Sequence, residues 1–325
     1  MLAAGTSSCG ASRSGGAALT IYNGQHEQTT IALVKAFERS SGIKVSVRSG
    51  DEATLANQLL QEGSASPADV FYTENTTPLE ALREHGMLAS VAPATLAQVP
   101  ARYSSEHGRW VGVSARLSVL VYNKTDLKPN QLPSSVLGLA GPRWKGKVAY
   151  APSESDFQPL VTAVAKLEGT ATAEAWLRGL QANARDLPDN EAVTSQVSAG
   201  QSELAPINHY YWYRLRRETG GSGFHAALHF FAPHDPGYLL DVSGAAVLRS
   251  SSHRAAAQKF LAFLTSAAGQ RVLAHSDSYE YPLHPRVPGP TGLPPLAKLA
   301  PAELTPAELG DGSAALALEQ KVGVL

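Results

Sequence analysis

Residues 204–213, Leu-Ala-Pro-Ile-Asn-His-Tyr-Tyr-Trp-Tyr, join a short apolar run to the charged first turns of a helix that stops at residues 220–221, Gly-Gly. The apolar run predicts a buried strand, and the change in residue spacing after Asn208 predicts the helix. Within a strand, Tyr210 and Tyr211 would point to opposite faces, whereas at a strand-to-helix junction both phenols can point toward one place. Open α/β sheets bind ligands at the carboxyl ends of their strands. This junction is therefore a candidate ligand site, with an aromatic plug between helix and sheet as the alternative.

Strands and helices also alternate through the first 90 residues. The predicted strands are 18–22, 43–47 and 69–72, and the predicted helices are 25–39, 55–62 and 77–84. Short loops between alternating elements favour a parallel sheet covered by helices, so the fold class is α/β.

The chain is long enough for two lobes, because 325 residues exceed what one compact core usually holds. Segments 110–114 and 117–122 are predicted to be two long strands that carry the chain into a second lobe. A new alternation of strands and helices begins at residues 147–150, and residues 239–248 are predicted to cross back. The Pro-rich run 282–306 is expected to be a surface connector.

Composition excludes some classes of partner. The chain has 27 basic and 28 acidic residues, so its near-zero net charge indicates no general attraction to nucleic acid or to anionic membranes. An apolar content of 43% suits a globular protein, and no window approaches the roughly 18 apolar residues of a membrane-spanning helix.

Cys9 is the single cysteine, so an internal disulfide is impossible. A Gly residue and a Ser/Gly-rich run follow it, which resembles the acylated cysteine of a bacterial lipoprotein. The preceding residues 6–8, Thr-Ser-Ser, match that signal poorly, so a plain cytosolic tail with an incidental cysteine is the alternative. We expect residues 1–16 to form a tether.

The sequence motifs typical of enzymes are incomplete or absent in this chain. Residues 141–147 have the spacing of a phosphate-binding loop, but Val148 follows where Ser or Thr is needed, and the run precedes a strand. His26-Glu27 begins a zinc-protease motif that lacks its second histidine, and no Gly-x-Ser-x-Gly segment exists. The sequence therefore predicts a protein that is not an enzyme.

A metal-binding set is the stronger interpretation. His26, Glu74 and the pair Tyr210-Tyr211 each follow a predicted strand. Two phenolates, one carboxylate and a neutral imidazole balance a trivalent cation, and oxygen-rich ligation without thiolates favours ferric iron over zinc or calcium. Ionising each phenol at pH 7 costs about 4 kcal/mol, which only a strong Lewis acid repays twice. Six-coordination would leave two positions for water or an anion.

Segments 22–26, 66–74 and 208–212 resemble the signature segments of bacterial periplasmic ferric-iron-binding proteins, the substrate-binding components of iron ABC importers. Residues 235–237, 243–248 and 280–283 extend the resemblance over nearly the whole chain from about residue 18. It implies the two-lobed periplasmic-binding-protein fold of the class II type, with two hinge strands and a cleft between the lobes. The expected division is 17–114 plus 241–285 for lobe 1 and 115–240 plus 286–325 for lobe 2.

The resemblance also implies roles and partners. His26, Glu74, Tyr210 and Tyr211 would coordinate ferric iron as cargo, which the protein would deliver to a membrane permease. A periplasmic or extracellular monomer, with a lipid anchor at Cys9 as an option and no nucleic-acid partner, is expected.

One region departs from the family pattern. The family's synergistic anion implies anion contacts at Ser155, Asn190 and Asn208, for carbonate or phosphate. Residues 153–156 read Ser-Glu-Ser-Asp here, and these carboxylates would repel a phosphate although a helix N-terminus favours an anion. Carbonate, water, or Glu154 or Asp156 as a ligand all remain open.

Two other functions remain as alternatives. A carrier of an organic or anionic solute would use the tyrosines for stacking, and it would lack the colour of a ferric phenolate. A metal-dependent hydrolase would use Glu74 as base and His26 as ligand, but the sequence identifies no second acid-base group.

Overall fold

The computed structural model describes residues 19–325, so the predictions for Cys9 and for the tether 1–16 lie outside the described residues. Strands and helices alternate as the sequence predicts. The strands are β1 (Leu19–Gly24), β2 (Val45–Ser49), β3 (Val70–Thr73), β4 (Val111–Asn123), β5 (Val148–Tyr150), β6 (Ala184–Asp186), β7 (Leu204–Asn208), β8 (Ala226–His229), β9 (Leu240–Val247) and β10 (Tyr281–Pro282). The α-helices are α1 (Glu27–Ser41), α2 (Glu52–Glu62), α3 (Thr77–Glu84), α4 (Pro93–Leu96), α5 (Phe157–Glu168), α6 (Thr170–Asn183), α7 (Asn190–Ser198), α8 (His209–Glu218), α9 (Arg254–Thr265), α10 (Ala267–Ala274), α11 (Pro306–Leu309) and α12 (Ser313–Val322).

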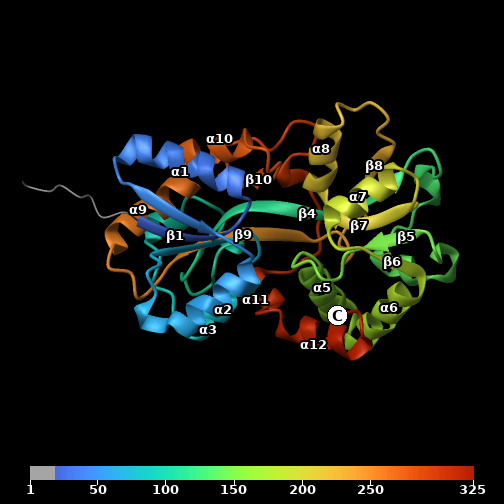
Figure 1. Cartoon of the computed structure of the whole chain (residues 1–325), viewed down its shortest axis with the longest axis horizontal. Coiled ribbons are helices and arrows are strands. Elements are labelled where there is room, and N and C mark those ends of the chain that lie inside the picture. The colour runs from blue at the N-terminus through green and yellow to red at the C-terminus, as the bar shows by residue number, and fades with distance from the viewer. Residues whose placement is uncertain (1–18) are drawn as a thin grey trace, which may run out of the picture.

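The strands pair in the order β2-β1-β3-β9-β4-β7-β5-β6, with β8 and β10 as further partners of β4. On one side, β1 pairs in parallel with β2 and β3. On the other side, β5 pairs in parallel with β6 and β7. Each parallel group is covered by helices on both faces, as parallel sheets require (Figure 1). The two-lobed α/β fold predicted from the sequence is confirmed.

Strand β4 connects the two lobes. Its first part pairs with β9 as far as Leu117, and from Ser118 onward it pairs with β7. All 13 of its residues are buried, and β4 and β9 run side by side between the lobes (Figure 1). The prediction of two separate strands at 110–114 and 117–122 was wrong. The residues between them, Ala115-Arg116, carry no turn signal, and Arg116 continues the strand because its charge is paired inside the protein.

Helix α1 shows how local sequence positions the first part of the cleft. It begins directly after His26 and ends where Gly42 adopts the left-handed φ of 71°, which a residue with a side chain rarely takes. Its face of Leu33, Val34 and Phe37 is buried, and the Phe37 ring meets Phe260 of α9 edge-to-face at 5.1 Å. Helix α1, which follows the end of β1, is therefore packed against α9.

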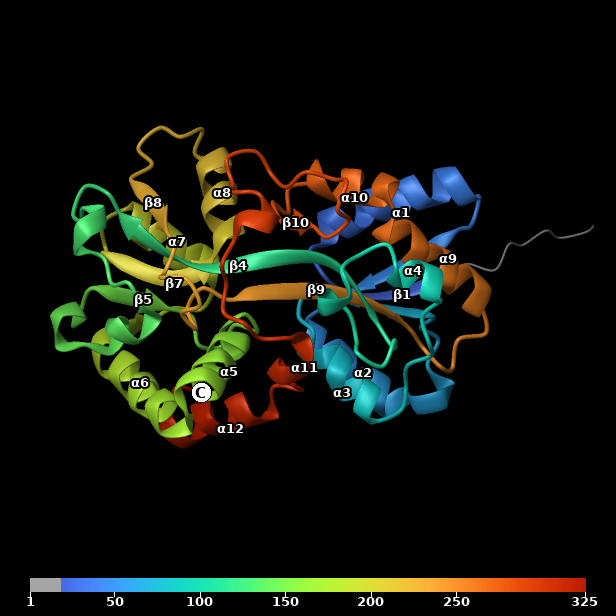
Figure 2. The same cartoon turned by 180° about the vertical axis from the view of Figure 1, so that it is seen from behind.

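The C-terminal part spans the rear of the molecule. After β10 the chain crosses behind β4 and β9 and reaches α11 and α12 (Figure 2). Helix α11 contacts α3 in one lobe and α5 in the other, and α12 packs on α5 and α6. Residues 282–306 thus form the predicted connector, with one 3-10 turn at Leu296–Lys298. None of the helices among residues 19–325 is long and apolar enough to cross a bilayer.

Candidate metal centre

The four side chains singled out in the sequence lie where strands end. His26 is the residue before α1 and follows β1, Glu74 follows β3, and Tyr210 and Tyr211 lie in the first turn of α8 directly after β7. The first two belong to one parallel group of strands, and the tyrosines belong to the other. The carboxyl ends of both groups therefore face one cleft.

Three of these side chains contact one another across the cleft. The Tyr210 hydroxyl donates to Glu74 Oε1 at 2.7 Å, and His26 Nε2 lies 3.2 Å from the same oxygen. The His26 and Tyr210 rings meet edge-to-face, with their centroids 4.9 Å apart. Because the hydroxyl of Tyr210 reaches a carboxylate from the other lobe, the cleft is closed in this structure.

Asp156 joins the two tyrosines from the start of α5. The hydroxyls of Tyr210 and Tyr211 both donate to Asp156 Oδ2, at 3.0 and 3.1 Å. The two phenol rings lie 4.3 Å apart, so both oxygens point to the same carboxylate. The sequence does not decide whether Asp156 is a ligand. The structure brings it into contact with both phenols.

Arg116 is the residue that the sequence reasoning missed. Its side chain is fully buried, with Nε 3.4 Å from Asp156 Oδ1 and Nη2 3.1 Å from Asp241 Oδ2. Its Nη1 also donates to the backbone carbonyl of Glu74. One guanidinium thereby connects α5, β9 and the loop after β3. An arginine in the middle of an otherwise uncharged run, residues 111–122, is the signal that could have revealed it, since a buried charge requires partners.

Glu280 is a further carboxylate beside the cleft. One ligand atom each from His26, Glu74 and Glu280 lie within 4.8 Å of one another, a spacing suited to a shared metal ion. Glu280 Oε2 accepts hydrogen bonds from Ser114 and Gln25, whereas Oε1 has no hydrogen-bond partner among the described residues. The sequence had marked residues 280–283 only as part of a resemblance.

The loop that carries Glu74 is fixed by a buried carboxylate on α2. Glu52 Oε2 accepts from the backbone N–H of Asn75 at 2.9 Å, and Glu52 also accepts from the Thr73 hydroxyl. Gly24 permits this arrangement, since a Cβ there would lie 2.5 Å from the Cβ of Glu52. Glu74 is thus held in place through the residues before and after it, Thr73 and Asn75.

His209 has a structural role and lies outside the cluster formed by His26, Glu74, Asp156, Tyr210 and Tyr211. Its Nδ1 accepts from the Leu117 backbone N–H at 3.1 Å, and its Nε2 lies 2.8 Å from the Tyr279 carbonyl. Burial lowers the pKa of this imidazole to about 4, so it is neutral and anchors the start of α8 to β4.

Two of the three predicted anion contacts share a small cavity with Asp156. Asn190 and Asn208 line a cavity of about 20 Å³ together with Asp156. Ser155 Oγ accepts from the Asn75 side chain at 3.3 Å. Such a volume holds one water molecule but not a phosphate, because about 10–15 Å³ is the space that one water needs. In the closed form, a larger anion would have to displace the Asp156 carboxylate.

Residues 65–299 match the family described as bacterial extracellular solute-binding proteins. This chain belongs to that family. It is 42% identical over 263 residues to the Fe(3+)-binding periplasmic protein of Serratia marcescens, covering 81% of this chain and 78% of that protein. Identity to the major ferric iron-binding protein of Neisseria meningitidis serogroup B is 38% over 311 residues, covering 94% and 93%.

Solved structures agree. The iron-bound HitA structure from Pseudomonas aeruginosa superposes with a TM-score of 0.91 at 43% identity, covering 94% of this chain and 99% of that one. The resemblance to ferric-iron-binding proteins stated from the sequence is confirmed, and the family is one of solute-binding proteins, not of enzymes.

In this solute-binding protein, burial favours the neutral forms of the side chains that meet in the cleft. Burial raises the pKa values of the Tyr210 and Tyr211 phenols well above 10, and the neighbouring carboxylates Asp156 and Glu74 raise them further. Burial, followed by Asp156, raises the pKa of Glu74 well above its usual value. Burial lowers the pKa of His26, with Arg214 and Arg116 adding to the effect. A cation in the cleft would replace the protons held by the two phenols and Glu74, whereas His26 is already neutral.

Proposed function

We propose that this protein binds ferric iron in the cleft between its lobes and delivers it to a membrane permease as the substrate-binding component of an ABC importer. The observation that carries the proposal is a chain of contacts across the cleft, in which Tyr210 links Glu74 and His26 to Asp156 and Tyr211. The printed functions of relatives from Serratia and Neisseria support the same cargo.

His26, Glu74, Tyr210 and Tyr211 are the proposed ligands, and Asp156 is the proposed fifth one. Two phenolates and Glu74 carry three negative charges, which balance the ferric ion, while Asp156 is balanced by Arg116. Burial also raises the pKa values of Asp241, to about 6, and of Glu280; Asp241 stays mainly ionised at pH 7 and shares the Arg116 guanidinium with Asp156. Hard oxygen ligands of this kind suit ferric iron better than zinc, which favours His and Cys.

The position of Asp156 affects whether a synergistic anion can bind in the cleft. Carbonate or phosphate would use Ser155, Asn190 and Asn208, and the two asparagines line the same small cavity as Asp156. We therefore propose that Asp156 takes the place of a phosphate in the closed form. Water or a small carbonate would fill a remaining coordination position.

Iron would be delivered when the two lobes move apart about their hinge. Ligands from both lobes hold the closed state, and separation of the lobes about β4 and β9 would remove the tyrosines from His26 and Glu74. Relatives are described as periplasmic, so we propose a periplasmic or extracellular monomer. A lipid on Cys9 would tether it beside its permease.

The test is a visible spectrum with metal analysis of the purified protein. Iron bound to phenolate absorbs visible light, so the loaded protein should be coloured, whereas a carrier of an organic solute should be colourless. The double variant Tyr210→Phe/Tyr211→Phe should lose both iron and colour. Tyr213→Phe is the matched control, because Tyr213 lies on the same helix but stacks on Tyr279. Retention of iron and colour by the double variant would overturn the proposal.

A further inference from the structure

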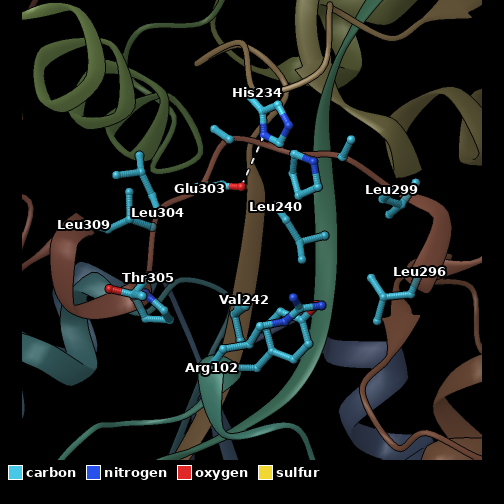
Figure 3. Close-up of a pocket in the computed structure, with 15 residues that line it drawn as sticks. Arg102, His234, Leu240, Val242, Leu296, Leu299, Glu303, Leu304, Thr305 and Leu309 are labelled. Carbon is cyan, nitrogen blue, oxygen red and sulfur yellow. Dashed lines mark hydrogen bonds and ion pairs between the residues drawn. The ribbon is translucent and has the colours of Figure 1, made fainter.

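A cavity of about 440 Å³ lies behind the hinge strands (Figure 3). The C-terminal connector crosses this face of the molecule (Figure 2). The apolar wall of the cavity comes from three separate parts of the chain. We call it the rear pocket and define it by Tyr103, Leu240, Val242, Leu299, Leu304 and Leu309. The volume lies within the range of about 300–1,000 Å³ that is typical of small-molecule sites.

Strand β9 separates the rear pocket from the candidate metal centre. Side chains alternate along a strand, so Leu240 and Val242 face the pocket while Asp241 between them faces the other way. Asp241 pairs with Arg116 at 3.1 Å, and Arg116 pairs with Asp156 of the cluster. A shift of β9 therefore acts on both sites at once.

The walls of the rear pocket also belong to both lobes. Leu309 lies on α11, which contacts α3 in one lobe and α5 in the other. The cleft is closed here, since Tyr210 reaches Glu74 across it. When two lobes open at the front around hinge strands, their rear edges approach each other. Opening of the cleft should therefore narrow the rear pocket, and a molecule in the pocket should oppose opening.

The lining indicates what kind of molecule fits. Leucine, valine and proline side chains form most of the wall, and Arg102 lies at one end with His234 and Glu303 at the other (Figure 3). The guanidinium of Arg102 donates to the Tyr103 hydroxyl at 2.6 Å. None of the ion pairs within residues 19–325 includes Arg102. His234 and Glu303, 3.7 Å apart, are paired with each other, so Arg102 is the end that favours a carboxylate.

We propose that the rear pocket binds a small amphipathic monocarboxylate, with its carboxylate on Arg102 and its apolar chain against the leucines, and that the bound molecule holds the lobes closed. Closure then slows release of the metal from the front cleft, a consequence that rests on the proposed function. The ligand acts only through its preference for the closed form, because a molecule that binds both forms equally shifts nothing.

Binding is tested first, on the full chain both without metal and after addition of ferric iron, so that the closed form is included. Octanoate is the probe, measured by isothermal titration calorimetry, with octylammonium as a probe of the same length and opposite charge. We expect saturable octanoate binding, weaker octylammonium binding, and about a tenfold loss of octanoate affinity in Arg102→Gln. Arg143→Gln is the matched control and should bind octanoate normally. Arg102 and Arg143 are both exposed, and each guanidinium lies 4.7 Å from the ring of the following aromatic residue.

No saturable binding of octanoate, equal binding of octylammonium, or unchanged binding by Arg102→Gln would each overturn the proposed site. A second variant, Leu299→Trp, fills the pocket and should abolish octanoate binding. Normal octanoate affinity in that variant would equally contradict the assignment.

Coupling is tested next, by the rate at which a chelator removes iron from the loaded protein. Saturating octanoate should slow this rate about fivefold in the wild type and leave it unchanged in Arg102→Gln. An equal rate with and without octanoate would overturn the coupling. If the protein holds no iron at all, the proposed function fails, and calorimetry still decides whether the rear pocket binds the carboxylate.

Discussion

Iron loading should release protons, because the structure buries the proposed ligands in neutral form. The pKa values of the Tyr210 and Tyr211 phenols lie well above 10, so ionising each at pH 7 costs more than about 4 kcal/mol, at about 1.36 kcal/mol per unit. The raised pKa of Glu74 adds part of a third proton. His26 adds none, since its lowered pKa leaves it neutral. Between two and three protons should leave as iron binds.

The release of protons determines how the iron affinity changes with pH. Iron binds the deprotonated groups, so its affinity falls as the pH falls, by about tenfold per pH unit for each proton released. From pH 7 to pH 6 the affinity should therefore fall roughly 100- to 1,000-fold. The assay is competition with a chelator of known protonation, repeated at half-unit steps between pH 6 and pH 7.5.

Tyr211→Phe should lower the slope of log affinity against pH by one, and Tyr213→Phe should leave it unchanged. A wild-type slope below one would refute the reasoning, as would an equal slope for Tyr211→Phe, because the phenols would then not ionise on loading.

Three further predictions concern single positions. Asp156→Asn removes the carboxylate shared by both phenols, so iron loading should require added carbonate or phosphate; a variant that colours fully without either anion would contradict this. Glu319 is fully buried, and burial raises its pKa from 4.5 to about 8. The unfolded chain holds fewer protons than the folded one between these values, so the wild type loses stability as the pH rises from about 4.5 to 8. The full shift corresponds to about 4–5 kcal/mol, and we expect about half, roughly 2 kcal/mol, because small movements of α12 would let water solvate the carboxylate once it ionises. Urea unfolding at pH 5 and pH 8 should show Glu319→Gln gaining that amount over the wild type at the higher pH, whereas a constant difference would refute it. In Gly112→Ala the new Cβ would lie 2.0 Å from the Tyr103 carbonyl oxygen, so the variant should lose about 3 kcal/mol or more in the same unfolding measurement; wild-type stability would contradict this close approach.

Much of the architecture was predictable because it depends on local patterns. The spacing of apolar residues predicted the alternation of strands and helices, and the positions of His26, Glu74 and Tyr210 directly after strands predicted that they would share a cleft. Those inferences need only the period of side chains along each element and the rule that ligands lie at strand carboxyl ends.

Other features required the folded chain. The continuous strand through Arg116 could not be distinguished from two strands, because a lone charge in an apolar run normally ends a buried segment. The partners that stabilise the guanidinium, Asp156 and Asp241, are 40 and 125 residues away along the chain. Their approach depends on which strands pair, and periodicity does not specify that choice.

The sequence by itself determined the class of fold and the chemical types that meet in the cleft, since both follow from short-range spacing and from charge. Only the tertiary structure decided that Asp156 joins both phenols, that Glu280 lies beside Glu74, and that a rear pocket forms behind β9. These features depend on distances between side chains of different elements. Such distances are set by how the two lobes and the C-terminal connector pack together, and that packing is a property of the whole chain.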